Sequence, residues 1–198
     1  MIKYSTITRN KEFGLVITGK NNYSRVEKNI SISENTKAGI KVENDAQASI
    51  IQNNIESNFS QGILLTESTY GHIEGNQISK NFKANIALGG PKASDCIILN
   101  NTISSSRAEG IFLIEVGFCW LIRNQIMDNA DGIVMFDSNP NIESNQINNN
   151  MRSGVSCLGS SFPKINGNVI FGNHQSGINL RDSSTGSISN NKIFKNFF

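Results

Sequence analysis

The amino-acid sequence predicts an all-β protein, a right-handed parallel β-helix of about eight coils with three short strands per coil. Three observations predict this fold: a unit of 22 to 25 residues repeats along the chain, isoleucine or another apolar residue recurs at fixed positions of the unit, and asparagines follow them. The composition agrees, since 29 Asn and 28 Ile among 198 residues combine turn-forming amides with β-branched side chains.

The repeat is clearest over residues 62–84, where it reads G-I-x-L, a variable bend, and I-x-x-N-x-I-x-x-N. Insertions fall in the bend after G-I-x-L, as at 89–92, and the first coil departs from the pattern around 26–32. The coils begin at Gly14, Gly39, Gly62, Asn85, Gly110, Gly132, Gly154 and Gly177.

Four apolar columns follow from this register, and each apolar position is flanked by polar or variable ones, as in half-buried strands. Stacking coil on coil would bury all four in one core. The columns are Leu15, Ile40, Ile63, Ile86, Ile111, Ile133, Val155 and Ile178; Ile17, Val42, Leu65, Leu88, Leu113, Met135, Cys157 and Leu180; Ile50, Ile73, Ile98, Leu121, Ile142, Ile165 and Ile188; and Ile32, Ile55, Ile78, Ile103, Ile126, Ile147, Ile170 and Ile193.

Two asparagine columns mark the bends. Asparagine tolerates left-handed backbone, and its amide can bond turn groups and a stacked neighbour, so we expect ladders with a structural role. The columns are Asn53, Asn76, Asn101, Asn124, Asn145, Asn168 and Asn191, and Asn10, Asn35, Asn58, Asn81, Asn129, Asn150, Asn173 and Asn196, with Ser106 substituting once.

Residues 1–198 are expected to form a single domain. Helical and leucine-rich repeats are disfavoured because Gly or Asn interrupts every few residues, and helical periodicity is absent. No capping helix is apparent at either end, although open β-helix edges need covers. We therefore expect part of a longer chain, or ends that partner proteins cap.

Charge and cysteine usage restrict the partners and the compartment. A net charge of +2 without a basic cluster argues against binding to nucleic acid. The sequence has no apolar run of 18 residues, which a membrane-spanning helix would need, and its N-terminus does not resemble a secretory signal. The three separated cysteines match neither a disulfide framework nor a metal motif. We expect a cytoplasmic (intracellular) protein, possibly in a large cytoskeletal or other assembly.

The repeat, as in residues 62–81 and 154–173, resembles the parallel β-helix repeats of the pectin-lyase-like superfamily over practically the whole chain. It is most similar to the short Asn-rich repeats of carbohydrate-binding and sugar-hydrolase domains, of F-box proteins and of periplasmic copper-maturation proteins. The resemblance implies the fold. It implies little about function, because the superfamily includes lyases, glycosidases and non-catalytic binding proteins.

A search for catalytic groups favours no site. Glu115 and Asp137 stand at equivalent positions of adjacent coils, about 5 Å apart, a spacing that a retaining glycosidase could use. No Lys, Arg, Tyr or His supports the pair in the neighbouring coils of that column, so a solvated strand end is favoured. His72, placed in the bend before Ile73, and His174 lie four coils apart and fit no triad. We expect no enzyme activity, cofactor or metal site.

One surface carries apolar residues at positions that should face water. Neighbouring coils would gather them into a stripe, together with Trp120 and Ile122 of the next strand, and such patches usually mark docking surfaces. The residues expected to bind a protein partner are Leu64, Phe112, Ile114, Val134, Phe136 and Leu158.

The sequence thus favours a non-catalytic β-helix scaffold or protein-interaction module of a larger assembly. Two alternatives come from the resemblance: a carbohydrate-active protein (polysaccharide lyase, epimerase or glycosidase), and the substrate-receptor β-helix of a ubiquitin ligase. The apolar stripe favours the scaffold and the receptor, whereas a groove with aromatic, acidic and basic residues would favour the carbohydrate-active protein.

Overall fold

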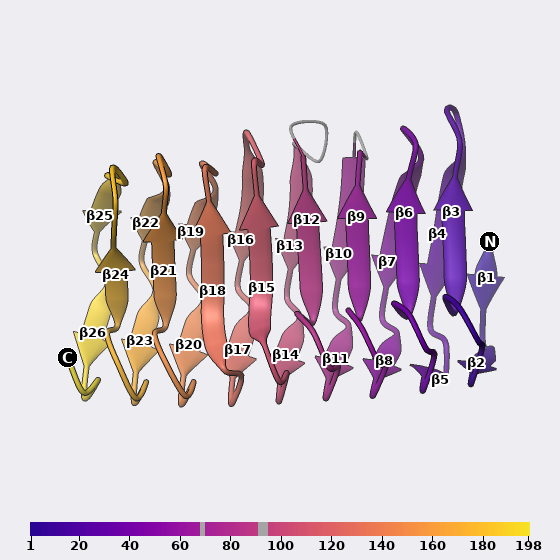
Figure 1. The fold of residues 1–198 in the computed structure, drawn as a ribbon, viewed down its shortest axis with the longest axis horizontal. Coiled ribbons are helices and arrows are strands. Elements are labelled where there is room, and N and C mark those ends of the chain that lie inside the picture. Colours follow the sequence, from indigo (N-terminus) through magenta and orange to yellow (C-terminus); the bar gives the residue numbers. More distant parts are fainter. Residues whose placement is uncertain (68–69, 91–94) are drawn as a thin grey trace.

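Strands of three parallel sheets wind around one long axis in the computed structural model, which describes residues 1–67, 70–90 and 95–198 (Figure 1). Each coil contributes one strand to each sheet, and a strand pairs in parallel with the strands three places before and after it. The described residues contain no helix. The predicted β-helix of about eight coils is confirmed.

The first sheet, called sheet A, lies behind in the view of Figure 1 and consists of β1 (Ile2–Lys3), β4 (Tyr23–Glu27), β7 (Gln47–Ile51), β10 (Tyr70–Glu74), β13 (Cys96–Leu99), β16 (Cys119–Ile122), β19 (Asn141–Glu143), β22 (Lys164–Asn166) and β25 (Ser187–Ser189). Sheet B consists of β2 (Thr6–Thr8), β5 (Ser31–Ser33), β8 (Asn54–Glu56), β11 (Gln77–Ser79), β14 (Thr102–Ser104), β17 (Gln125–Met127), β20 (Gln146–Asn148), β23 (Val169–Phe171) and β26 (Lys192–Phe194). Sheet C, in front, consists of β3 (Leu15–Thr18), β6 (Ile40–Glu43), β9 (Ile63–Thr66), β12 (Ile86–Gly89), β15 (Glu109–Ile114), β18 (Asp131–Phe136), β21 (Val155–Leu158) and β24 (Ile178–Leu180).

The core consists of the four predicted apolar columns, which pair in register from coil to coil. Their members in the middle coils are almost completely buried, in one continuous cluster. In the last coil the same columns are open: Leu180, Ile188 and Ile193 are each more than 40% exposed. Burial of an Ile or Leu side chain stabilises by about 1.5–3 kcal/mol, so the middle coils hold most of the hydrophobic stabilisation.

Both asparagine columns form the expected ladders. In the first, Asn53 Nδ2 donates to Asn76 Oδ1 at 3.0 Å, and Asn76 Nδ2 donates to Asn101 Oδ1 at 3.0 Å. Each Nδ2 also reaches a backbone carbonyl of the preceding coil, as Asn76 does at Ile50 O, 2.8 Å away. The ladder begins one coil earlier than predicted, at Asn29. Every amide of the ladder therefore finds partners inside the fold.

The left-handed residues stand next to the asparagines rather than at them, which corrects the sequence prediction. Gln52 and Asn100, each with a φ of 54°, precede the buried Asn53 and Asn101. The amide must point into the core to join the ladder, so the preceding residue makes the turn. Each coil has three such corners; the one after sheet B uses Arg9, Glu34, Ser57, Lys80, Ser105, Asp128, Asn149, Gly172 and Lys195.

The interruption of the second ladder at Ser106 is repaired by Asn85. In other coils this position holds glycine, because a Cβ would collide with the ladder amide: at Gly62 an added Cβ would lie 2.7 Å from Asn81 Nδ2. Serine leaves that space free. Asn85 Oδ1 accepts from Asn81 Nδ2 at 2.8 Å, and Asn85 Nδ2 donates to Asn129 Oδ1 at 3.1 Å. The two departures from the repeat therefore compensate each other.

Candidate functional site

Three chemically active side chains project from one strand of sheet A. In β10, Gly71 and Ile73 point inward, so Tyr70, His72 and Glu74 share the outer face. His72 Nε2 lies 2.8 Å from Glu74 Oε2, and the side chains are 23% and 37% exposed. Neighbouring groups of this row are about 7 Å apart along the strand. The imidazole of His72 therefore contacts a carboxylate and has a phenol beside it on the same face.

A guanidinium joins this face from two coils away. Arg25 of β4 aligns with Ser49 of β7, which aligns with His72, so the backbones of Arg25 and His72 are roughly 10 Å apart. Arg25 Nε donates to Glu27 Oε2. This hydrogen bond lowers the pKa of Glu27 below its usual range and keeps the carboxylate ionised. The bond occupies only Nε, so the outer nitrogens of Arg25 stay available to a second anion.

Two hollows meet at Arg25. One, of 140 Å³, lies between Tyr23 and Tyr70 over Gln47 and Ser49. The other, of 540 Å³, extends past Lys28 and Glu74 toward the corner between sheets A and B. Ser49 is small, so it leaves space between Arg25 and His72. Arg25 therefore borders both hollows, Tyr70 the first and Glu74 the second, whereas His72 stands between Tyr70 and Glu74 on β10 and lines neither.

The outer row continues along the axis beyond His72. His72 aligns with Ile97, and Ile97 with Trp120, whose ring meets Phe118 edge-on at 5.3 Å. Trp120 in turn borders a hollow that reaches Lys164. We call the outward row Arg25, Ser49, His72, Ile97, Trp120, Asn141 and Lys164 the sheet A track. Its rise of about 4.8 Å per coil suits an extended polymer lying along the helix.

The prediction that His72 lies in a bend is wrong. It occupies the middle of β10, and its contact with Glu74 follows from the alternation of Tyr70, His72 and Glu74 around the inward Ile73. That alternation is visible in the sequence as Y-x-H-x-E. It was missed because His72 was placed in a bend and was considered only for a Ser/His/Asp arrangement, whereas the signal is a strand with three polar groups on one face.

The carboxylates of Glu115 and Asp137 do occupy equivalent corners, but one of them has a structural partner. Asp137 Oδ1 accepts a hydrogen bond from the backbone N–H of Ser160 at 2.7 Å. Both residues are exposed and have left-handed backbone. The geometry agrees with the interpretation of a solvated strand end.

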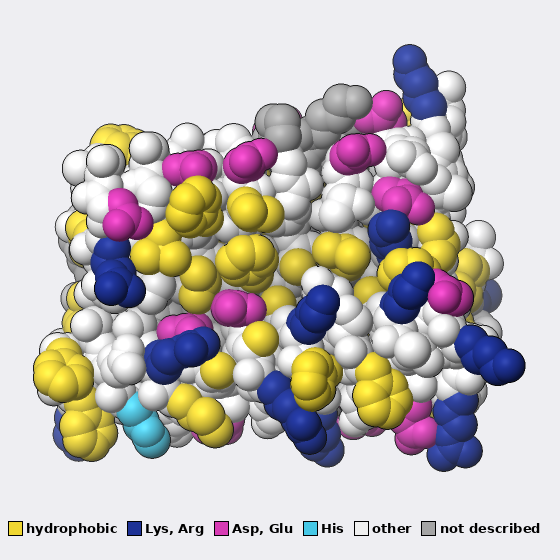
Figure 2. Space-filling model, viewed as in Figure 1, with side chains coloured by type: hydrophobic (Ala, Val, Ile, Leu, Met, Phe, Trp, Pro, Cys, Tyr) yellow, Lys and Arg dark blue, Asp and Glu magenta, His cyan; other side chains and the backbone are white. Residues whose placement is uncertain are grey.

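The six residues of the predicted docking face share the outer surface of sheet C, where Figure 2 shows a band of hydrophobic side chains. Phe112 aligns with Val134, and Ile114 with Phe136. Ile114 and Phe136 are 38% and 40% exposed, whereas Val134 is 8% exposed. Trp120 and Ile122 belong to sheet A, so grouping them with this stripe was wrong. Docking of a protein on Leu64, Phe112, Ile114, Val134, Phe136 and Leu158 stays a prediction.

The remaining candidate groups are isolated from this chemistry. His174 is exposed at the corner after sheet B, where its ring meets Phe197 at 5.8 Å. The three cysteines are buried and free, and burial raises the pKa of Cys157 to about 12. Among the described residues, no group of three or more His, Cys, Asp or Glu could hold a metal ion, and no helix is long and apolar enough to cross a membrane.

Comparison with known families settles the relationship of the chain. The model of the right-handed β-helix region matches residues 1–119 and again residues 91–198. The chain belongs to the right-handed β-helix family. A search of curated proteins finds no match.

Solved structures place this β-helix beside enzymes of similar fold. The periplasmic alginate epimerase AlgG (T265N mutant) superposes with a TM-score of 0.86 at 18% identity, covering 92% of this chain and 48% of its own. The A-module of the mannuronan C-5 epimerase AlgE6 of Azotobacter vinelandii gives 0.85 at 16% identity, covering 97% and 57%. The AlgE4 A-module of the same organism gives 0.52 at 13% identity. The chain spans about half the length of the first two structures.

These comparisons contradict the expectation of a non-catalytic scaffold and of no enzyme activity. All three structures are named as epimerases, one of alginate and two of mannuronan, and none is named as a scaffold. At this identity the likeness shows the fold. It nevertheless favours the carbohydrate-active alternative over the scaffold, and the mixed aromatic, acidic and basic face of sheet A is the kind of surface that this alternative requires.

Proposed function

We propose that this β-helix acts on a uronate-containing polysaccharide and removes the C5 proton of one sugar unit, as a C5 epimerase does. The observation that carries the proposal is the constellation on sheet A: His72 hydrogen-bonded to Glu74, Tyr70 beside it and Arg25 opposite. The epimerase structures of similar fold support the choice of substrate class.

Each group has a role in the proposed reaction. Arg25 binds the uronate carboxylate, which makes the C5 proton more acidic because the charge that develops moves toward the guanidinium. Glu74 accepts a hydrogen bond from His72 Nε2–H, which assigns the lone pair to Nδ1. His72 Nδ1 then takes the C5 proton as general base.

Tyr70 completes the cycle. Its hydroxyl returns a proton to the opposite face of C5, which inverts that centre and restores the carboxylate and the C–H bond. Water then reprotonates Tyr70 and deprotonates His72. The polymer lies along the sheet A track, where Trp120 offers an aromatic face and Lys164 a second cation to neighbouring units.

Hydrolysis of glycosidic bonds is the weaker alternative. A glycosidase needs two free carboxyl groups across the bond. Of the pair Glu115 and Asp137, Asp137 is bonded to the backbone of Ser160. Glu27 and Glu74 on sheet A are held by Arg25 and His72. The constellation therefore favours proton transfer over hydrolysis.

The test is turnover of mannuronan and polygalacturonate by the 198-residue chain, followed by proton NMR of the sugar units and by ultraviolet absorbance of any unsaturated product. We expect new C5 epimers from one polymer. His72→Gln and Tyr70→Phe should each lower the rate by roughly 10²-fold or more, the usual contribution of a general acid or base.

The matched control is His174→Gln, which changes the other histidine at an exposed corner. It should retain the rate of the unmodified chain. Absence of any change in both polymers would refute the proposal, and so would equal rates for His72→Gln and His174→Gln. Unsaturated product that depends on His72 would keep the proton abstraction but make the protein a lyase.

A further inference from the structure

A second concave surface lies away from sheet A, at the corner where the chain passes from sheet B to sheet C. It is a groove of 530 Å³ that spans several coils. Glu34, Ser57 and Lys80 occupy equivalent left-handed positions along its length, one per coil. Because these corners stack at the strand spacing, the groove runs along the helix axis for roughly 14 Å.

Two exposed aromatic rings form the apolar part of this groove. Phe59 and Phe82 follow the ladder residues Asn58 and Asn81 on adjacent coils, and their side chains are 64% and 51% exposed. Both asparagines are fixed by the ladder, which holds the corners rigidly. Large exposed rings have no role in the core. Their faces are suited to the C–H groups of a sugar ring.

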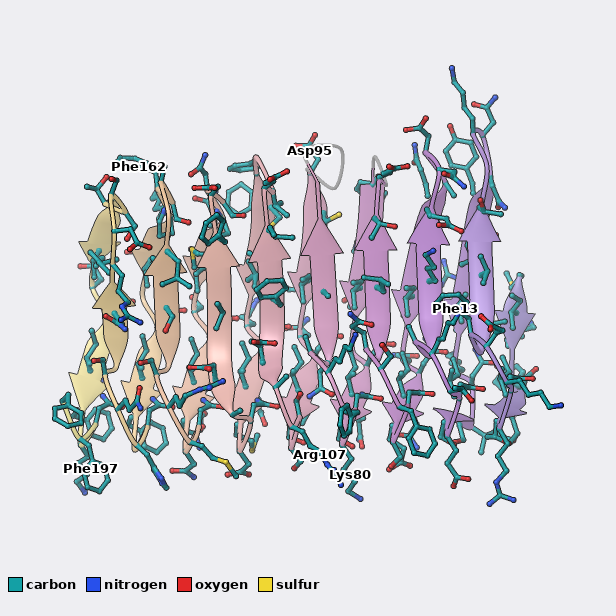
Figure 3. The ribbon with its side chains drawn as sticks, viewed as in Figure 1. Phe13, Lys80, Asp95, Arg107, Phe162 and Phe197 are labelled. Atoms are coloured by element: carbon teal, nitrogen blue, oxygen red, sulfur yellow. The ribbon has the colours of Figure 1, made fainter. Side chains whose placement is uncertain are left out.

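Cations border the rings. The Arg107 guanidinium lies 5.3 Å from the centroid of the Phe82 ring. Lys80 Nζ is 3.8 Å from Glu56 Oε2 with its side chain 66% exposed, so solvent screens this pair. The acidic Glu34 is already neutralised by Arg9, whose Nε donates to Glu34 Oε2 at 2.6 Å. Figure 3 shows Lys80 and Arg107 close together, both projecting from the same edge of the β-helix.

We propose that this groove is a second binding site for an acidic polysaccharide, with sugar rings on Phe59 and Phe82 and carboxylates at Lys80 and Arg107. The combination of aromatic faces with cations selects a ligand that is both ring-containing and anionic. The choice of a uronate polymer rests on the proposed function, whereas the anionic character of the ligand rests on the groove alone. The site holds the polymer and takes no part in proton transfer.

The experiment is a calorimetric titration of the full chain with a short mannuronate oligomer. Two binding events are expected, one on each surface. Phe59→Ala combined with Phe82→Ala should weaken one event by about tenfold or more, since loss of aromatic contacts costs on the order of 1.4 kcal/mol. Trp120→Ala should weaken the other event and leave the groove unchanged.

A charge variant covers the case in which the double Phe variant unfolds. Lys80→Gln combined with Arg107→Gln should weaken the same event and make it independent of salt, because the ionic contacts are lost. Phe197→Ala and Lys195→Gln are the matched controls: they change the equivalent corner positions of the last coil, outside the groove.

The outcomes separate this inference from the proposed function. Unchanged titrations for the Phe59/Phe82 and Lys80/Arg107 variants would overturn it, as would equally tight binding of a neutral glucose oligomer. If no turnover is found but the groove event disappears in these variants, the groove inference stands and the proposed catalysis falls.

Discussion

At the scale of single residues, the ladder asparagines are the most demanding positions of this β-helix. The side chain of Asn76 takes part in four hydrogen bonds: Oδ1 accepts from the backbone N–H and the Nδ2 of Asn53, and Nδ2 donates to Ile50 O and Asn101 Oδ1. All of these groups are buried. A buried donor that loses its partner costs about 1–3 kcal/mol.

Replacing Asn76 by Leu should therefore destabilise the chain by about 3 kcal/mol, because several buried groups of the adjacent coils lose their partners at once. Lys83→Ala, at an exposed corner, should change the stability by less than about 0.5 kcal/mol. Urea denaturation followed by circular dichroism measures both. Equal shifts would contradict the ladder as described.

The compensation between Asn85 and Ser106, which both depart from the repeat, gives a second prediction. Asn85→Gly should leave Asn81 and Asn129 without their partner, and Ser106→Asn should crowd Asn85, so each should destabilise by about 1–3 kcal/mol. The double variant restores the repeat found in other coils and should recover most of the loss, with a coupling energy of about 2 kcal/mol. Strictly additive effects in a urea double-mutant cycle would show that the two residues act separately.

Buried thiols give a pH dependence at the same scale. Burial raises the pKa of Cys157 and of Cys96 to about 12. In the unfolded chain a thiol ionises near pH ~8.5. Between these values the unfolded chain loses the proton and the folded chain keeps it, so stability is lost as pH rises from about 9 toward 12 and is unaffected below that range.

Cys157→Val isolates this effect from the other groups that titrate at alkaline pH. We take the unfolding free energy of the unmodified chain minus that of the variant. This difference should be constant from about pH 6 to 8 and then fall as pH rises, because only the unmodified chain loses stability through this thiol. Urea titrations of the two proteins across this range provide the measurement. A difference that grows with pH would mean that Cys157 ionises more easily in the folded chain.

At the scale of strands and corners, the inward residues were predictable and the outward ones only in part. Ile50, Ile73 and Ile98 pair in the predicted register, because a shift by one residue would turn the apolar side chains of these strands outward. Asn29 was missed because the sequence around 26–32 departs from the repeat. Trp120 was placed on the correct strand, after the bend that follows sheet C, but it was grouped with the apolar stripe of sheet C although β16 belongs to sheet A.

The candidate site could likewise be predicted from the sequence only in part. Tyr70, His72 and Glu74 could have been placed together from the alternation around Ile73, but the relation of His72 to Arg25 needs the pairing of three successive strands. The first coil departs from the repeat around 26–32, so Arg25 and Ser49 are 24 residues apart, whereas Ser49 and His72 are 23 residues apart. Sequence spacing alone therefore could not align Arg25 with His72.

The apolar outer face of sheet C gives a prediction about the stability of its strands. Changing Phe112 and Phe136 together to Ser should leave the β-helix folded, with a loss of stability well below the roughly 6–10 kcal/mol expected for two buried phenylalanines, since both side chains point away from the core. A circular-dichroism melt tests this. Complete unfolding would mean that these rings are part of the packing, whereas co-purification of a protein that the variant loses would support docking on this face.

At the scale of the whole molecule, the β-helix is a stiff rod that carries different chemistry on each side. Sheet A presents the track with Arg25, His72 and Trp120, sheet C an apolar band, and the corner between sheets B and C an aromatic and cationic groove. Repetition fixes the spacing of these groups along one axis. A polymer with its own repeat is the ligand that such a rod can contact at many coils.

Hydrogen exchange at the C5 carbon of a uronate shows whether the groups of sheet A remove its proton, as we propose. The 198-residue chain is incubated with mannuronan in deuterated water, and the sugar units are examined by mass spectrometry after chemical hydrolysis. We expect deuterium at C5 with the unmodified chain and with His174→Gln, and none with His72→Gln. Absence of deuterium in every sample, or equal incorporation by His72→Gln, would contradict the proposal.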